Sequence, residues 1–237
     1  MSASSELRPR PLLPGGVPRS SRGLLAAVAA LLAVVALSDL FAVFAGVRIH
    51  LLIDGDHGFA TAPQQELDNA YSLYETAGNL QSMTYVPCAV LFVVWFYRMR
   101  RDTGLLAPDR FRNGPGWAVA AWVIPLAQFW MPYRVAVDMW GASTPLPDDD
   151  EPYRTSIWPV NLWWGLFVFS TLFGRYAESG YEDAETLGQV RDAVVQYMAA
   201  DILDIAAAAA AVYFAVRLTT MQRLKASEGP YRTAVSG

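Results

Sequence analysis

The sequence predicts an all-α integral membrane bundle of about four transmembrane helices plus one proline-broken segment, either re-entrant or a fifth transmembrane segment. Three observations favour this fold. Apolar residues form long, nearly continuous runs, and the charged residues, 17% of 237, gather in the gaps between them. Tryptophans cluster around the runs, and a proline interrupts one run in its middle. A soluble domain spaces its apolar residues periodically, whereas a bilayer requires about twenty consecutive ones.

The chain begins with a polar tail, residues 1–22, that is rich in Pro and Arg. Such a composition does not bury a core, so we expect a disordered cytoplasmic tail. The apolar run 24–47 follows, and it is longer than the roughly 7–15 residues of a signal-peptide core. A weak cleavage pattern at 43–45 leaves signal-peptide removal as an alternative. We therefore expect an uncleaved first helix that opens a polytopic membrane domain, residues 23–220, before a short cytoplasmic tail, 221–237.

The second apolar run, 80–97, is preceded by an acid-rich segment, 48–79. Within this segment a Thr-Ala-Pro-Gln start at residue 61 and helical spacing of apolar residues predict a helix lying at the interface. The second run ends in three arginines, which predict its cytoplasmic end: Arg98, Arg100 and Arg101.

The central stretch, 113–140, holds four of the 8 tryptophans and three prolines. Its apolar part, 117–132, is long enough to enter a bilayer, but a proline removes a backbone donor and clashes with the preceding turn. The pattern predicts a helix–break–helix hairpin, tolerated in a membrane only where protein or water surrounds it. An interfacial helix, 133–140, should follow. The candidate break residues are Pro125, Gln128 and Pro132.

Two further apolar runs, 157–173 and 197–218, are separated by an acid-rich polar segment, 174–196. The last run contains two aspartates and then six alanines, 206–211, a smooth face suited to close helix packing.

Lysine and arginine in short loops mark the cytoplasmic side. By this rule both tails and the 98–116 loop are inside, and the 48–79 loop is outside. Inside termini require an even number of crossings, so one of five apolar segments, best the 117–132 run, does not cross. The competing topology has five crossings and an outside C-terminus. We expect a multi-pass plasma-membrane protein with a cytoplasmic N-terminus, anchored at the interfaces by Arg98, Arg100, Arg101, Trp117, Arg134 and Trp140.

Three segments together resemble a known family: FVVWFYRMRRD (92–102), PGWAVAAWVIPLAQFWMPYRV (115–135) and WPVNLWW (158–164). They are similar to the bacterial, mainly actinobacterial, integral membrane family known as domain of unknown function 4328. The resemblance covers roughly residues 25–225, and the middle segment is its most specific part. Gln128 stands where the family is expected to have Asn, which keeps an amide. The resemblance implies a membrane fold and carries no catalytic residues.

The most informative polar residues are three intramembrane carboxylate candidates, Asp39, Asp201 and Asp204. A carboxylate in hydrocarbon is costly, so it normally faces a bundle interior or water. A rise of about 1.5 Å per residue places Asp39 and Asp204 roughly 5–6 Å to the outer side of their span midpoints. Two acids at matched depth suit proton or cation binding. The alternative is that they are hydrogen-bonded glue between helices.

Other candidate sites are weaker. The Asp54–His57 turn has cation ligands but no defined geometry, and a solvated turn explains it equally. The tryptophans either line a lipid or quinone pocket or form interfacial belts. The single cysteine, Cys88, excludes an intramolecular disulfide and a Cys-based metal site. We expect no cofactor, metal ligand or catalytic residue.

The function predicted first is a non-enzymatic membrane module that docks or regulates a partner. The alternative is a small proton- or cation-coupled transporter that uses the intramembrane carboxylates. An enzyme is disfavoured, because the sequence has no nucleophile–base pair, metal cluster or phosphate loop. The expected partners are the lipid bilayer and either a second copy or another membrane protein. No basic stripe with interleaved aromatics points to nucleic acid.

Overall fold

The computed structural model describes residues 20–54, 63–106, 111, 113–144 and 156–228. All regular structure in these ranges is helical, without a strand, which confirms the all-α prediction. The predictions made for His57, for most of the N-terminal tail and for the end of the C-terminal tail fall on residues outside these ranges.

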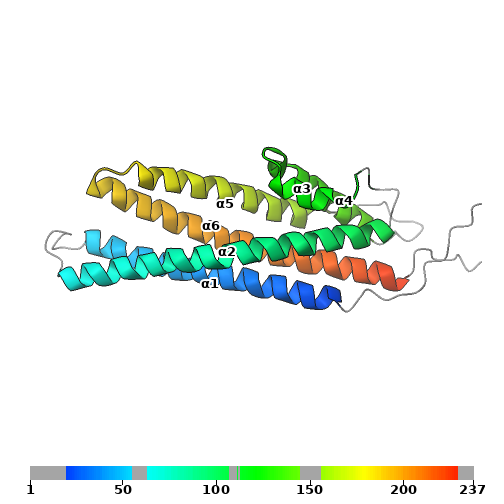
Figure 1. Cartoon of the computed structure of the whole chain (residues 1–237), viewed down its shortest axis with the longest axis horizontal. Coiled ribbons are helices and arrows are strands. Elements are labelled where there is room, and N and C mark those ends of the chain that lie inside the picture. The colour runs from blue at the N-terminus through cyan, green and yellow to red at the C-terminus, as the bar shows by residue number, and fades with distance from the viewer. Residues whose placement is uncertain (1–19, 55–62, 107–110, 112, 145–155, 229–237) are drawn as a thin grey trace, which may run out of the picture.

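Four long helices form an antiparallel bundle: α1 (Ser20–Asp54), α2 (Gln64–Leu106), α5 (Trp158–Glu182) and α6 (Leu187–Glu228). The start of α1 and the end of α6 lie at the same end of the bundle (Figure 1). α1 packs against both α2 and α6, and α6 packs against α5, whereas the backbones of α2 and α5 scarcely approach each other. Side chains alone therefore reach across the space between α2 and α5, and residues of both helices line the two cavities described below.

Three of these helices are long and apolar enough to span a membrane, judged by length and composition: 22–52 in α1, 64–105 in α2 and 187–226 in α6. α5 has 25 residues and is long enough, but Asn161 and Arg175 near its two ends lower its hydropathy. Among the described residues, three of the four expected crossings thus pass this test.

α2 is one continuous helix of 43 residues, so the helix expected before the second span is present from Gln64 and continues into that span without a break. The reason is packing. Ala77, 1% exposed, lies in a cluster with Ala42 and Ala45 of α1, and these small side chains let the two helices approach closely. The first half of α2 is thereby held along the bundle. At about 1.5 Å per residue the helix is about 65 Å long, well over a hydrocarbon core of about 30 Å.

The polar segment 174–196 is also mostly helical, because α5 runs on to Glu182 and α6 starts at Leu187. Gln189 supports this tight connection. Its side-chain oxygen accepts hydrogen bonds from the backbone N–H groups of Glu185 and Thr186, both at 2.9 Å, and so satisfies donors at the start of α6.

The proline-rich stretch forms a broken hairpin of α3 (Trp117–Val123), a 3-10 turn (Ala127–Phe129) and α4 (Met131–Ser143). The backbone leaves the helix at Ile124, with ψ 118°, one residue before Pro125. Leu126 then has φ 67° and ψ −50°, a strained γ-turn closed by the Ala127 N–H, which donates to the Pro125 backbone oxygen at 2.8 Å. Such a conformation costs a non-glycine residue about 1–3 kcal/mol. The hairpin lies at the end of the bundle where α6 finishes, and its turn points toward the middle of the bundle (Figure 1).

An aromatic core joins the hairpin to the bundle. Trp163 of α5 stacks on Phe214 of α6, with ring centroids 4.5 Å apart and planes 4° apart. Trp122 of α3 meets Phe92 and Phe96 of α2 edge-on, at 5.9 and 5.7 Å. Edge-on and offset pairs of this kind add about 0.5–1.5 kcal/mol each to the burial of the rings. The hairpin is therefore fastened to the bundle by its aromatic residues.

Candidate functional site

The centre of the bundle holds an amide bridge between two carboxylates. The side-chain nitrogen of Gln81 on α2 donates hydrogen bonds to Asp39 of α1, at 3.0 Å, and to Asp201 of α6, at 2.8 Å. An amide NH₂ group has two donors, so this bridge uses both. Three helices that lie far apart in sequence thus converge on one polar point.

The two bridged carboxylates are deeply buried. Asp39 is 4% exposed and Asp201 is 9% exposed. The second oxygen of Asp39, Oδ2, is buried without a hydrogen-bond partner. Within the described part of the chain, neither aspartate forms an ion pair with a Lys, Arg or His side chain. Buried polar groups are normally satisfied, so an orphaned carboxylate oxygen indicates a position prepared for a ligand or proton.

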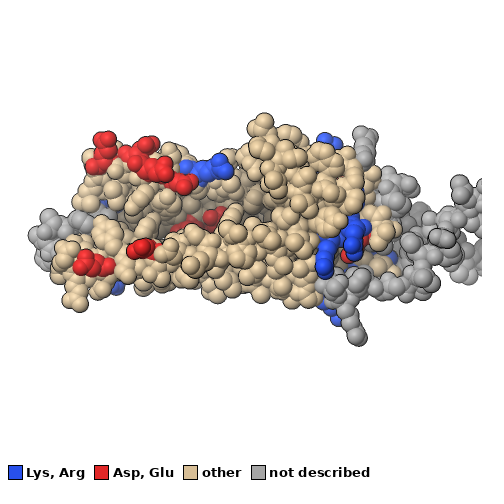
Figure 2. All heavy atoms as spheres, in the orientation of Figure 1, with Lys and Arg blue, Asp and Glu red and all other residues tan. Residues whose placement is uncertain are grey.

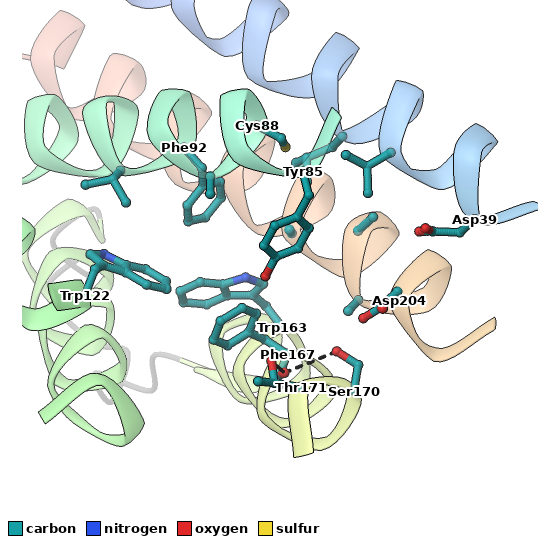
Figure 3. A pocket seen from close by; sticks show the side chains of 17 residues that line it. Asp39, Tyr85, Cys88, Phe92, Trp122, Trp163, Phe167, Ser170, Thr171 and Asp204 are labelled. Atoms are coloured by element: carbon teal, nitrogen blue, oxygen red, sulfur yellow. Dashed lines mark hydrogen bonds between the residues drawn. The ribbon is translucent and has the colours of Figure 1, made fainter. Parts of the chain in front are cut away.

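Asp204 lies three residues after Asp201, nearly one helical turn along α6. Together with Asp39 it borders a cavity of about 190 Å³. Figure 3 shows Asp39 and Asp204 at one side of this cavity, entering from different helices. The two aspartates that were expected at matched depth therefore border the same cavity, from the antiparallel helices α1 and α6.

The other side of the cavity is aromatic. Phe92, Trp122, Trp163 and Phe167 line it, and Tyr85 projects between the rings and the carboxylates (Figure 3). The walls between are mainly alanine, valine and leucine side chains of α1, α2 and α6. The cavity is therefore amphipathic, with carboxylates at one end and rings at the other.

A second cavity, of about 200 Å³, lies on the other side of the bridge along α2. Three tyrosines line it, Tyr74, Tyr181 and Tyr197, together with Gln81 and Asp201. The space-filling view shows a hollow between the upper and lower helices with acidic side chains inside it (Figure 2). The Gln81 bridge thus separates a tyrosine-lined space from an aromatic, apolar one.

The expected arginine anchors divide into two groups. Arg98, Arg101 and Arg134 are exposed on the surface. Arg100 is buried: its guanidinium donates to the backbone oxygen of Asn113 at 2.6 Å and lies 3.5 Å from the centre of the Phe111 ring. It fastens the end of α2 to the segment before α3 instead of facing lipid headgroups.

The two expected tryptophan anchors also differ. Trp117 is partly exposed, whereas Trp140 is 3% exposed, stacks on Phe214 and donates its indole N–H to the backbone oxygen of Ser156. Trp140 is a core residue because α4 packs against α2 and α6 and turns this face inward.

The hairpin residues Pro125, Gln128 and Pro132 do not line either cavity. Pro125 is exposed in the turn, and Pro132 is buried near the start of α4. The hairpin contributes to the site through Trp122 instead.

The sequence analysis did not single out Gln81, Tyr85 or Ser170, although all three belong to the site. Ser170 is buried at the cavity wall, where its hydroxyl donates to the backbone oxygen of Phe167 at 3.2 Å. The sequence signal that could have found them is the one used for the aspartates: a polar residue within or beside an apolar run tends to face the interior of the bundle.

The charges on the visible face are polarised. Asp and Glu gather at the end where α5 meets α6, and Lys and Arg appear mainly at the opposite end, with a wide uncharged band between (Figure 2). No group of three or more His, Cys, Asp or Glu side chains in the described ranges is placed to hold a metal ion.

Comparison with known proteins gives one match. The model of the family described as domain of unknown function DUF4328 matches residues 60–220, which confirms the resemblance seen in the sequence. No curated protein and no solved structure matches the chain.

Proposed function

Because the chain belongs to the DUF4328 family, whose description names no activity, we propose its function from the site itself: a small proton- or cation-coupled membrane carrier. The cation-binding groups are the carboxylates of Asp39, Asp201 and Asp204. One observation carries the proposal: Asp39 has a buried oxygen without a partner, and it borders the same cavity as Asp204.

This observation favours a carrier over a purely docking module. If the aspartates only held helices together, both oxygens of each carboxylate would be expected to accept hydrogen bonds from neighbouring donors. Here one bridge satisfies one oxygen of Asp39 and leaves the other, Oδ2, buried without a hydrogen-bond partner. The two cavities on either side of Gln81 also supply what a carrier needs, a space on each side of a closable contact.

The proposal includes a topology. The helices α1, α2, α5 and α6 cross the plasma membrane, and the hairpin of α3 and α4 is re-entrant from the cytoplasmic side. Three observations support this topology. The helices are long enough, the start of α1 and the end of α6 lie at the same end of the bundle, and the basic residues gather mainly at that end. The N-terminus is then cytoplasmic, the lipid bilayer is the partner, and the protein performs no catalytic step.

The test is cysteine accessibility in native membranes. Cys88 lines the cavity and is replaced by Ala first. Single cysteines then replace Asp39 and Asp204, with Leu40, 57% exposed on the outer face of α1, as a lipid-facing control and exposed Glu185 as a water-facing control. A charged, membrane-impermeant thiol reagent is expected to label positions 39, 204 and 185 and to leave position 40 unlabelled.

Labelling that reaches position 185 alone would mean that no water path leads to the carboxylates. The carrier proposal would then fail, and the docking module expected from the sequence would become the better hypothesis. Proton uptake into proteoliposomes, compared between the unsubstituted protein and Asp39→Asn, provides the functional readout.

A further inference from the structure

The size of the cavity beside Asp39 and Asp204, and the side chains that line it, restrict the class of ligand that it can bind. We propose that it binds a compact organic cation, an ammonium group attached to an aromatic ring or an apolar group of similar size. This inference deepens the proposed function, because it names the substrate class of the same site.

The carboxylate end sets the charge of the ligand. Asp39 Oδ2 is buried and unpartnered, and the Asp39 side chain points into the cavity (Figure 3). Asp204 borders the same space from α6. Within the described ranges no basic side chain forms an ion pair with either carboxylate, so a cationic ligand supplies the missing charge partner.

The opposite end sets the body of the ligand. Phe92, Trp122, Trp163 and Phe167 line it, and no charged side chain stands among them. A hydrated inorganic ion gains nothing from such walls, and the described residues hold no cluster of ligands suited to a metal ion. Aromatic walls instead bind apolar groups, and ring faces attract organic ammonium groups.

The volume sets the size. An apolar cavity of about 150 Å³ is large enough for benzene. The cavity here, at about 190 Å³, has room for one ring and a small head group, and it is smaller than the pockets of drug-sized ligands. Tyr85 lies between the two ends, with its hydroxyl beside the Trp163 ring (Figure 3).

The experiment measures binding to the purified full chain in detergent, by tryptophan fluorescence and calorimetry. Three probes separate the features: benzylammonium, with ring and charge; benzyl alcohol, of nearly the same shape without charge; and methylammonium, with charge and no ring. Benzylammonium is expected to bind, and each of the other two to bind at least about tenfold more weakly, since each lacks one of the two contacts.

Two variants locate the binding. Asp204→Asn keeps the shape of the side chain and is expected to weaken benzylammonium binding by about thirtyfold or more, because a desolvated charge partner is lost. Trp122→Leu changes only the ring end, and about a threefold to thirtyfold loss is expected for benzylammonium, with no change for methylammonium. Asp192→Asn, an exposed aspartate on the same helix, is the matched control and should change nothing.

The outcomes separate the inference from the proposed function. Equal binding of benzylammonium and benzyl alcohol would overturn the ligand class, as would benzylammonium binding that survives Asp204→Asn in a folded protein. If protons are carried in liposomes while benzylammonium does not bind, the carrier proposal stands and the organic cation is refuted. If no protons are carried, benzylammonium does not bind and the cysteines at 39 and 204 stay unlabelled, both fail.

Discussion

The bridge made by Gln81 has a measurable energy. Gln81→Leu removes both hydrogen bonds to the carboxylates while keeping a side chain of similar size. Hydrogen bonds between transmembrane helices average about 0.6 kcal/mol and reach about 1.7 kcal/mol, so two of them amount to about 1–3 kcal/mol. Asp39 is left with both oxygens unpaired, which moves the expected loss in free energy of unfolding toward the upper end of this range.

The assay is equilibrium unfolding in mixed micelles, followed by circular dichroism. Gln64→Leu is the matched control, because Gln64 also bonds an aspartate, Asp68 at 3.1 Å, but on the exposed surface of the same helix. That change should cost less than about 0.5 kcal/mol. If the two variants lose the same stability, the bridge contributes nothing, and the convergence of three helices at Gln81 has no energetic meaning.

Three further changes test the packing. Trp163→Ala should destabilise the bundle by about 3–5 kcal/mol, because Trp163 is 2% exposed and its stack with Phe214 is lost. Gly46→Val should cost about 1–3 kcal/mol in unfolding free energy, because even a Cβ at this position would lie 2.7 Å from Cγ of Met198 and push α1 away from α6. Leu126→Gly should raise the unfolding free energy by up to about 1 kcal/mol, since it relieves the strain of a positive φ and the side chain that it removes is 71% exposed.

Matched substitutions keep these three measurements interpretable. Trp158→Ala removes a half-exposed indole and should cost less than half as much as the buried tryptophan. Gly165→Val places the same side chain where nothing lies within 4 Å, so a loss there as large as at Gly46 would contradict the close approach of α1 to α6. A destabilising Leu126→Gly would show that the exposed side chain matters more than the backbone strain.

The bundle and the hairpin could be predicted because each follows from a local rule. Apolar runs of bilayer length give the long helices, and the residue before Pro125 leaves the helical conformation, as the residue before a proline tends to do. Pro87 lies inside α2 without ending that helix, so a proline alone does not decide the outcome. The extents of α2 and α6 could not be predicted in this way. Their polar halves look like loops or interfacial helices until the burial of residues such as Ala77 against Ala45 of another helix is known.

The candidate site was predictable in part for the same reason. An aspartate in an apolar run is conspicuous on its own, so Asp39 and Asp204 stand out in the sequence. The partner of Asp39 is 42 residues away, and which amide meets which acid depends on helix rotation, which no local pattern fixes. The burial of Trp140 and Arg100 likewise depends on how α4 and the segment around Phe111 fold back on the bundle.

The length of α2 bears on the electrical environment of the tyrosine-lined cavity. The 16 residues 64–79 precede the apolar run and add about 24 Å of helix beyond it. The surface potential of lipid headgroups fades over a Debye length of about 8 Å at physiological ionic strength. In the proposed topology, the local concentration of cations around this tip of the bundle is therefore set by the acidic side chains of the protein itself. Access to Asp201 should then respond to ionic strength and remain nearly indifferent to the charge of the surrounding lipids.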